Sequence, residues 1–126
     1  MSVIGIGTDI IDISRIANMK ESTRSRLAQR VLTQNELQKY QQLNFSVAFL
    51  AKRWTAKEAA SKALGTGIAN GISFQHFEIQ SLITGQPTLV LTNKALEVAT
   101  LLGAKNWHIS LADEKEFATA FVVLSS

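Results

Sequence analysis

The segment from Phe117 to Leu124 limits the possible folds more than any other part of the chain. Its sequence, FATAFVVL, places apolar residues on both sides of an extended strand, whereas a strand with one solvated face alternates apolar and polar residues. Both faces of the sheet that contains this strand should therefore be covered. Helices can cover one face, and either more of the same chain or a neighbouring subunit covers the other.

The remaining segments predict a single α+β domain over residues 1–126. Thr33 followed by Glu36 is a capping-box signature, which starts a helix. Apolar periodicity and glycine stops predict four helices over 16–31, 33–43, 46–64 and 93–102, and strands over 3–13, 77–83, 88–91, 107–112 and 117–124. The order β-α-α-α-β-β-α-β-β favours a mainly antiparallel sheet packed against the long helix 46–64, and a chain of this length has no room for a second core.

The first strand contains glycines at positions 5 and 7. Glycine inside a strand often marks a place where another element approaches closely. We expect the strand to bend near Asp9, because an acidic residue disfavours strand propagation. Asp9 is then either a turn or capping residue or a functional one, since sites gather at strand ends and loops.

The chain contains no cysteine, which excludes disulfides, thiolate zinc sites, iron–sulfur ligation and a catalytic thiol. The first residues, MSVIGIGTDIIDI, lack the basic region of a signal peptide. No apolar run approaches the roughly 20 residues that span a bilayer. We therefore expect a cytoplasmic protein without a membrane partner.

Positive charge is concentrated in the first half of the chain. Residues 1–62 contain ten Lys and Arg against five Asp and Glu, a net charge of +5, and residues 63–126 contain three against five, a net charge of −2. Five basic residues form a cluster that only Glu21 opposes: Arg15, Lys20, Arg24, Arg26 and Arg30. This basic cluster is either a solvated helix face or a surface for an anionic partner.

Asp9, Glu58, Lys62 and the loop Gly65-Thr66-Gly67 are the parts that would hold a magnesium-bound diphosphate. Magnesium takes one or two carboxylates and completes its shell with water and phosphate oxygens. Lysine would neutralise phosphate charge, and glycines would let the backbone approach it. In the alternative interpretation, Glu58 and Lys62 form an ordinary helical ion pair, because they are four residues apart.

Two segments resemble the signature segments of the holo-[acyl-carrier-protein] synthase family of 4′-phosphopantetheinyl transferases. They are GTDIIDISRI, residues 7–16, and FLAKRWTAKEAASKALGTGI, residues 49–68. Arg30-Val31-Leu32-Thr33, Asn70-Gly71 and His108-Ile109-Ser110-Leu111-Ala112 resemble the same family in order and spacing, so that the resemblance covers nearly the whole chain.

The resemblance implies a magnesium-dependent enzyme that transfers 4′-phosphopantetheine from coenzyme A to a serine of apo acyl carrier protein. The reaction would release adenosine 3′,5′-bisphosphate and support fatty acid biosynthesis. Asp9 and Glu58 would be the metal ligands, and Glu58 and Lys62 the catalytic residues. The coenzyme A pocket would be formed by Lys62, Gly65, Thr66, Gly67, Gly85, Pro87 and His108. The base that removes the serine proton would be a metal-activated water, Glu58 or a carboxylate of the partner.

The resemblance also implies a homotrimer with coenzyme A sites between subunits. The basic cluster would then dock the acidic carrier protein, with contacts from Arg15, Arg24 and Arg26. Many members of the family have Ser-His where this chain has Ala112-Asp113. A second histidine therefore has no counterpart here.

Two other functions fit parts of the sequence. A basic nucleic-acid-binding module would explain the sequence pI of about 9.5, but only Tyr40 and Trp54 lie near the basic cluster as possible stacking residues, and no nucleic-acid motif accompanies them. We therefore expect no nucleic-acid partner. A magnesium-dependent enzyme acting on another nucleotide diphosphate would share the site but would not use a carrier protein.

Overall fold

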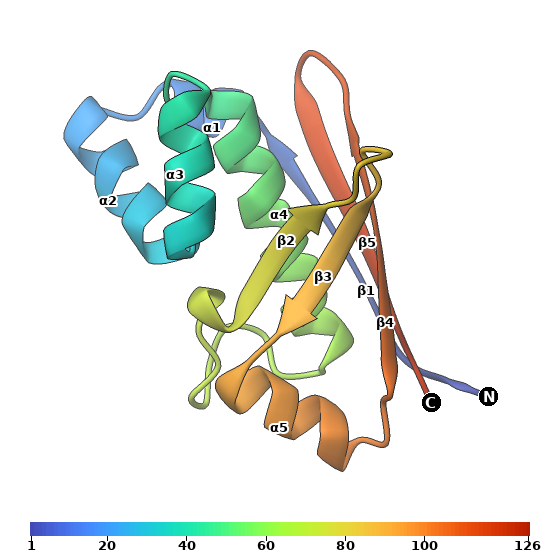
Figure 1. Cartoon of the computed structure of the whole chain (residues 1–126). Helices are drawn as coiled ribbons and strands as arrows, with labels where there is room; N and C mark the ends of the chain where they lie inside the picture. Colours follow the sequence, from blue (N-terminus) through green and yellow to red (C-terminus); the bar gives the residue numbers. More distant parts are fainter.

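The computed structural model describes all residues, 1–126, as two antiparallel sheets packed around a long helix, α4 (Figure 1). The elements are, in chain order, β1 (Val3–Asp12), α1 (Ser14–Ala17), α2 (Glu21–Val31), α3 (Gln34–Gln42), α4 (Val47–Ala63), the short 3-10 helix η1 (Phe74–His76), β2 (Phe77–Ser81), β3 (Pro87–Leu91), α5 (Asn93–Leu101), β4 (Asn106–Asp113) and β5 (Phe117–Ser125). The α+β class expected from the sequence is confirmed. None of the helices combines the length and apolarity needed to cross a membrane.

The strand β5 is the centre of a three-stranded sheet of order β1-β5-β4, and β2 pairs with β3 alone. One side of β5 packs against α4 through residues that are at most 2% exposed: Ala118, Ala120, Val122 and Leu124. The other side of the sheet carries large apolar residues that are between 41% and 62% exposed: Ile6, Ile10, Phe117 and Phe121. The chain therefore covers one face of the sheet itself, and the alternative in which more of the same chain covers the second face is wrong.

The glycines of β1 allow α4 to pack directly on the strand. A Cβ added to Gly7 would lie 2.0 Å from the carbonyl oxygen of Ala59, and one added to Gly5 would lie 2.1 Å from that of Ala63. Neither oxygen can give way easily, because both belong to the backbone of a buried helix. The close approach expected from the sequence is confirmed, and it brings Asp9, two residues after Gly7, to the surface of α4.

We expect Gly7→Ala to lower the free energy of unfolding by about 3 kcal/mol, because the methyl group overpacks the contact between strand and helix. Urea unfolding followed by circular dichroism measures this loss. Gly103→Ala is the control: a Cβ there meets nothing within 4 Å, so that only the strain of its positive φ remains, about 1 kcal/mol. Equal losses in the two variants would contradict the steric explanation.

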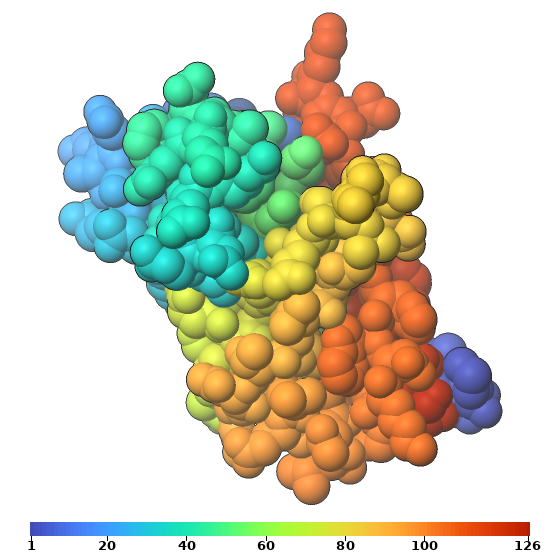
Figure 2. All heavy atoms as spheres, viewed as in Figure 1, coloured from blue at the N-terminus to red at the C-terminus, as the bar shows by residue number.

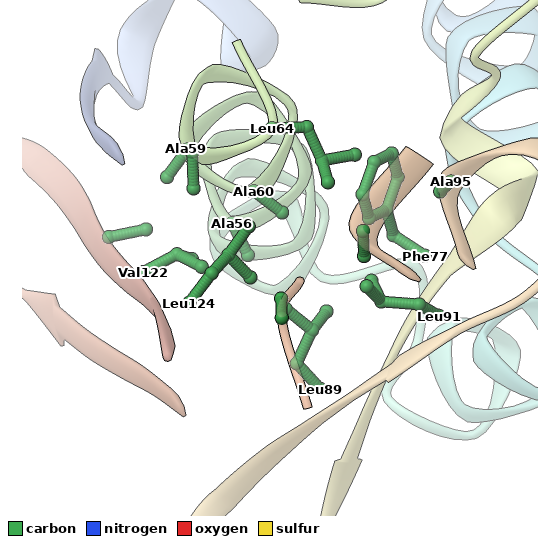
Figure 3. Packing of buried hydrophobic residues seen from close by; sticks show 14 of the residues in the cluster. Ala56, Ala59, Ala60, Leu64, Phe77, Leu89, Leu91, Ala95, Val122 and Leu124 are labelled. Atoms are coloured by element: carbon green, nitrogen blue, oxygen red, sulfur yellow. The ribbon is translucent and has the colours of Figure 1, made fainter. Parts of the chain in front are cut away.

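Two hydrophobic clusters share α4. In the first, which has 16 buried residues, the alanines of the helix lie between two groups of side chains (Figure 3). Val122 and Leu124 of β5 lie on one side, and Phe77, Leu89 and Leu91 of the β2–β3 hairpin lie on the other. The second cluster has 11 buried residues and joins α4 to β1, α1, α2 and α3. Burial on several sides explains why α4 has no continuous polar face.

The single helix predicted over 16–31 is two helices in the structure, and this part of the prediction is wrong. α1 ends at Ala17 and α2 begins at Glu21. Arg24 lies across the break, and its Nη1 is 3.4–3.5 Å from the carbonyl oxygens of Ile16, Ala17 and Met19. A side chain thus satisfies carbonyl groups that a continuous helix would pair with its own N–H groups. Every other predicted boundary within the chain agrees with the structure to within two residues.

The bend predicted near Asp9 is also absent. Asp9 pairs in register with Ala120, inside a ladder that is regular from Gly5 to Asp12. The one register shift of β1 lies between Val3 and Gly5. Asp9 is compatible with the strand because partners on α4 satisfy its carboxylate.

Candidate active site

Three polar side chains of α4 lie beside the Asp9 carboxylate of β1. Thr55, Glu58 and Lys62 are three and four residues apart and so share one face of the helix. The Thr55 hydroxyl donates to Asp9 Oδ2 at 2.7 Å, and Lys62 Nζ donates to Asp9 Oδ1 at 2.9 Å. Lys62 also donates to the carbonyl oxygen of Thr8 at 3.2 Å. The structure thus brings together the acidic and basic residues that the sequence singled out.

Glu58 has an environment that disfavours its charged form. Burial raises the pKa of its carboxyl, and the nearby Asp9 carboxylate raises it further, whereas Lys62 opposes both effects. A bound cation would relieve the repulsion between these two carboxylates.

The helical ion pair between Glu58 and Lys62 is not present. The ammonium of Lys62 pairs with Asp9 instead, at 2.9 Å, and so joins α4 to β1. The alternative interpretation of Glu58 and Lys62 as a local surface pair is therefore wrong.

The donor set of Asp9 and Glu58 fits magnesium. Both side chains supply hard oxygen ligands, and the carboxylates lie close enough to shift the pKa of Glu58. No group of three or more His, Cys, Asp or Glu side chains forms a fuller cage. Two carboxylates suffice for magnesium when phosphate and water supply the remaining ligands.

The loop Gly65-Thr66-Gly67 follows α4, and its backbone N–H groups donate to carbonyl oxygens of the last turn of the helix. The N–H groups of Thr66 and Gly67 both donate to the carbonyl oxygen of Ser61, and that of Gly65 donates to Lys62. Gly65 and Gly67 have φ angles of 80° and 63°, which glycine adopts without strain. The loop therefore presents an open surface, since a Cβ at either glycine meets nothing within 4 Å, but its amides are already engaged inside the chain.

Pro87 and His108 line a cleft between β3 and β4, together with Gln86 and Lys105. Gly85 forms the preceding hairpin turn, with a φ of 89°. His108 Nε2 lies 3.4 Å from the hydroxyl of Ser125. The structure thus places two of the predicted coenzyme A residues, Pro87 and His108, in one cleft, and Gly85 in the turn that precedes it.

This cleft lies apart from Asp9 in the same chain. Asp9 and Leu111 both pair with Ala120, from opposite sides of β5, so that two strand spacings of about 4.8 Å separate them. His108 is three residues further along β4, roughly another 10 Å. Its side chain leaves the sheet on the face opposite to α4, because it pairs with Val123 rather than with the buried Val122 or Leu124. One chain alone does not bring the two sets of predicted residues together.

Among the predicted partner-binding residues, Arg15 contacts the helix that carries Glu58. It is exposed, and its guanidinium carbon lies 5.5 Å from the centre of the Trp54 ring. Trp54 precedes Glu58 by one turn of α4. Arg15 therefore flanks the candidate site on the surface.

Arg24 and Arg26 differ in their surroundings. Arg24 is half-buried and donates to the end of α1, so that it has a structural role. Arg26 is exposed and forms no ion pair. The structure thus leaves Arg26 free for a partner and engages Arg24 within the chain.

Asp113, which stands where the resemblance implies a histidine, lies at the start of the turn between β4 and β5. This turn projects from the body of the molecule (Figure 2). Lys52 Nζ lies 3.7 Å from Asp113 Oδ1 and connects α4 to the base of the turn.

Sequence reasoning missed a buried ion pair next to the site. Lys57 is fully buried and donates to the carboxylate of Glu36 and, at 2.6 Å, to the carbonyl oxygen of Val31. Glu36 Oε2 accepts the N–H of Ile79 at 2.9 Å. Burial lowers the pKa of Lys57, and the charge of Glu36 opposes this effect. The sequence signal from which this pair could have been predicted is Lys57 itself, a charged residue in the alanine-rich part of α4.

The comparisons with known proteins identify the family to which the chain belongs. Residues 5–122 match the family model of the 4′-phosphopantetheinyl transferase superfamily. The holo-[acyl-carrier-protein] synthase of Yersinia pestis (strain Pestoides F) is 50% identical over 126 residues, which is 100% of both chains.

Solved structures of this family share the fold. The crystal structure of the Neisseria meningitidis holo-[acyl-carrier-protein] synthase has a TM-score of 0.89 and 36% identity, and the match covers 99% of this chain and 100% of that one. The Bacillus anthracis synthase, crystallised in complex with CoA (3′,5′-ADP), has a TM-score of 0.79 and 36% identity, and the match covers 97% and 96% of the two chains. The resemblance carried by the two signature segments is therefore confirmed, and the chain belongs to the 4′-phosphopantetheinyl transferase superfamily.

Proposed function

We propose that this chain, acting as one transferase domain over residues 1–126, moves 4′-phosphopantetheine from coenzyme A to a serine hydroxyl of an apo acyl carrier protein. Adenosine 3′,5′-bisphosphate leaves, and the holo carrier protein serves fatty acid biosynthesis. The observation that carries this proposal is the grouping of Asp9, Glu58 and Lys62 in a chain that is 50% identical, over its full length, to a holo-[acyl-carrier-protein] synthase.

Asp9 and Glu58 are the proposed ligands of magnesium, which when bound supplies positive charge to the diphosphate of coenzyme A. Lys62 contributes a second positive charge. Its side chain is 52% exposed, so that its ammonium can exchange Asp9 for a phosphate oxygen at small cost. This residue would balance the charge that develops on the phosphate oxygens during transfer.

The transfer forms a bond between the serine oxygen and phosphorus and breaks the bond from phosphorus to the departing bisphosphate. The serine proton goes to a base on the same side of the site. Glu58 is the proposed catalytic residue for this role, acting directly or through a water molecule, because its carboxylate lies in the same group as Asp9 and Lys62. Most of the acceleration comes from orientation and charge neutralisation.

Coenzyme A would extend from the Gly65-Thr66-Gly67 loop to the cleft lined by Pro87 and His108, next to the turn that contains Gly85. Because His108 and Asp9 leave opposite faces of the sheet, a site between subunits would unite the two sets. The exposed apolar face that includes Ile10 and Phe121 supplies a surface for such an assembly. The number three rests on the resemblance to the family.

Light scattering should give a mass of three times the 13.8 kDa of the chain. Phe121→Glu should reduce this to the mass of a monomer and abolish transfer, because a charge on the apolar face disfavours its burial. Leu101→Glu is the control, since Leu101 is an exposed apolar residue of α5. A wild-type monomer that is stable and active would overturn the assembly.

Mass spectrometry of an apo acyl carrier protein tests the proposed reaction. After incubation with the chain, coenzyme A and magnesium, the carrier protein should gain the mass of one 4′-phosphopantetheine group, and chelation of magnesium should prevent the gain. A carrier protein of unchanged mass would overturn the proposal.

Arg15 is the proposed carrier-protein contact that we choose for a mutational test. Arg15→Glu should raise the carrier-protein concentration at half-maximal rate about tenfold and leave coenzyme A affinity unchanged, because it reverses a charge on the docking surface only. Titration of each substrate separately measures the two effects. Lys94→Glu on α5, which reverses another exposed charge, is the control. Equal sensitivity to both substrates would place Arg15 in the coenzyme A site instead.

A further inference from the structure

The two oxygens of the Asp9 carboxylate have partners of opposite character. Oδ2 accepts the hydrogen bond of Thr55, which is 1% exposed, at 2.7 Å. Oδ1 accepts from Lys62, whose side chain is 52% exposed, at 2.9 Å. One oxygen is therefore held by a fixed group inside the protein, and the other by a long side chain that reaches into solvent.

The hydroxyl of Thr55 is placed for this single contact. Threonine in a helix commonly donates back to the carbonyl oxygen of the preceding turn. Here the one hydrogen bond of the Thr55 side chain leaves α4 and reaches β1. Its branched side chain has few rotamers, and burial removes competition from water. Lys62, in contrast, has a flexible stem and can move.

We propose that Thr55 is a positioning residue for Asp9: its hydroxyl fixes Oδ2 and so directs Oδ1 toward the turn of α4 that carries Glu58 and Lys62. This inference rests on the proposed role of Asp9 as a ligand of a divalent cation. The hydroxyl of Thr55 has Asp9 as its hydrogen-bond partner. It acts through Asp9 by keeping one carboxylate oxygen in place before the cation arrives, which is how hydrogen-bonded outer groups strengthen metal sites.

Calorimetric titration of the protein with magnesium, without coenzyme A or carrier protein, tests this role. Thr55→Val keeps the shape and removes the hydroxyl, and it should weaken magnesium binding about tenfold. Thr55→Ser restores the hydroxyl and should bind magnesium within about twofold of the wild type. Thr100→Val is the control, because the Thr100 hydroxyl donates to Leu96 within the exposed face of α5.

Rate measurements give a second, independent readout. In Thr55→Val the magnesium concentration at half-maximal rate should increase more than kcat falls, since added cation compensates for a less well-ordered carboxylate. Circular dichroism and urea unfolding in a chelator verify that all variants fold, and a merely structural role would change these properties without changing magnesium affinity.

Two outcomes overturn the inference alone: magnesium binding by Thr55→Val equal to that of the wild type, or binding by Thr55→Ser as weak as that of Thr55→Val. Either result would leave transfer by the wild type intact. A wild-type chain that binds no magnesium overturns the inference together with the metal-ligand role of Asp9. A wild type that binds magnesium but transfers nothing overturns the proposed function, while the comparison of the Thr55 variants still decides the positioning role.

Discussion

Replacing Asp9 by Asn, or Glu58 by Gln, should lower kcat by about 10²–10³-fold at saturating magnesium. Each change keeps the size of the side chain and removes the negative charge that a divalent cation requires. The loss falls on the chemical step, because a bound cation stabilises charge that develops on the diphosphate during transfer. Steady-state rates with coenzyme A and apo carrier protein measure the loss, and magnesium titration of the free protein should show weakened binding in parallel.

Both variants should remain folded. Asp9 pairs with Lys62 near the surface, where an ion pair contributes at most about 1 kcal/mol, and an Asn at position 9 can still accept the Thr55 hydrogen bond. Glu97→Gln, at an exposed carboxylate of α5, is the matched control and should retain the wild-type rate. Near-normal turnover of either active-site variant would show that the two carboxylates do not hold the metal.

Local signals predicted most of the fold. The Thr33–Glu36 capping box is present as expected, because it depends only on residues three apart. The glycines at 5 and 7 correctly indicated a close approach, since only a neighbouring backbone requires the absence of a Cβ. The break between α1 and α2 was not predictable in this way, because neither proline nor glycine marks residues 18–20 and the Arg24 contact across the break exists only in the folded chain.

The residues of the candidate site were predicted from the sequence, but the contacts between them were not. Spacing alone favoured a pair between Glu58 and Lys62, yet Lys62 contacts Asp9, which is 53 residues away in the sequence. Thr55 gave no signal by itself, because its role appears only when β1 lies against α4. Tertiary contacts of this kind depend on how helices and strands pack against one another, and the periodicity of a helix does not predict that packing.

The buried pair of Lys57 and Glu36 leads to the largest expected change in stability. Lys57→Met should lower the free energy of unfolding by about 3–5 kcal/mol, because it leaves Glu36, which is 3% exposed, as a buried charge without its closest partner. Arg53 Nε, 3.8 Å from Glu36, is too distant to replace the lost hydrogen bond. Urea unfolding measures the loss.

Lys52→Met is the matched control for this prediction. Lys52 lies on the same helix and also forms an ion pair, but its side chain is 31% exposed and 3.7 Å from Asp113, so that its removal should cost at most about 1 kcal/mol. The contrast isolates burial as the cause, because both changes replace the same ammonium with the same thioether. If the two variants lose equal stability, then the Glu36 carboxylate does not need Lys57, and the hydrogen bonds from the N–H groups of Thr33 and Ile79 suffice to stabilise its buried charge.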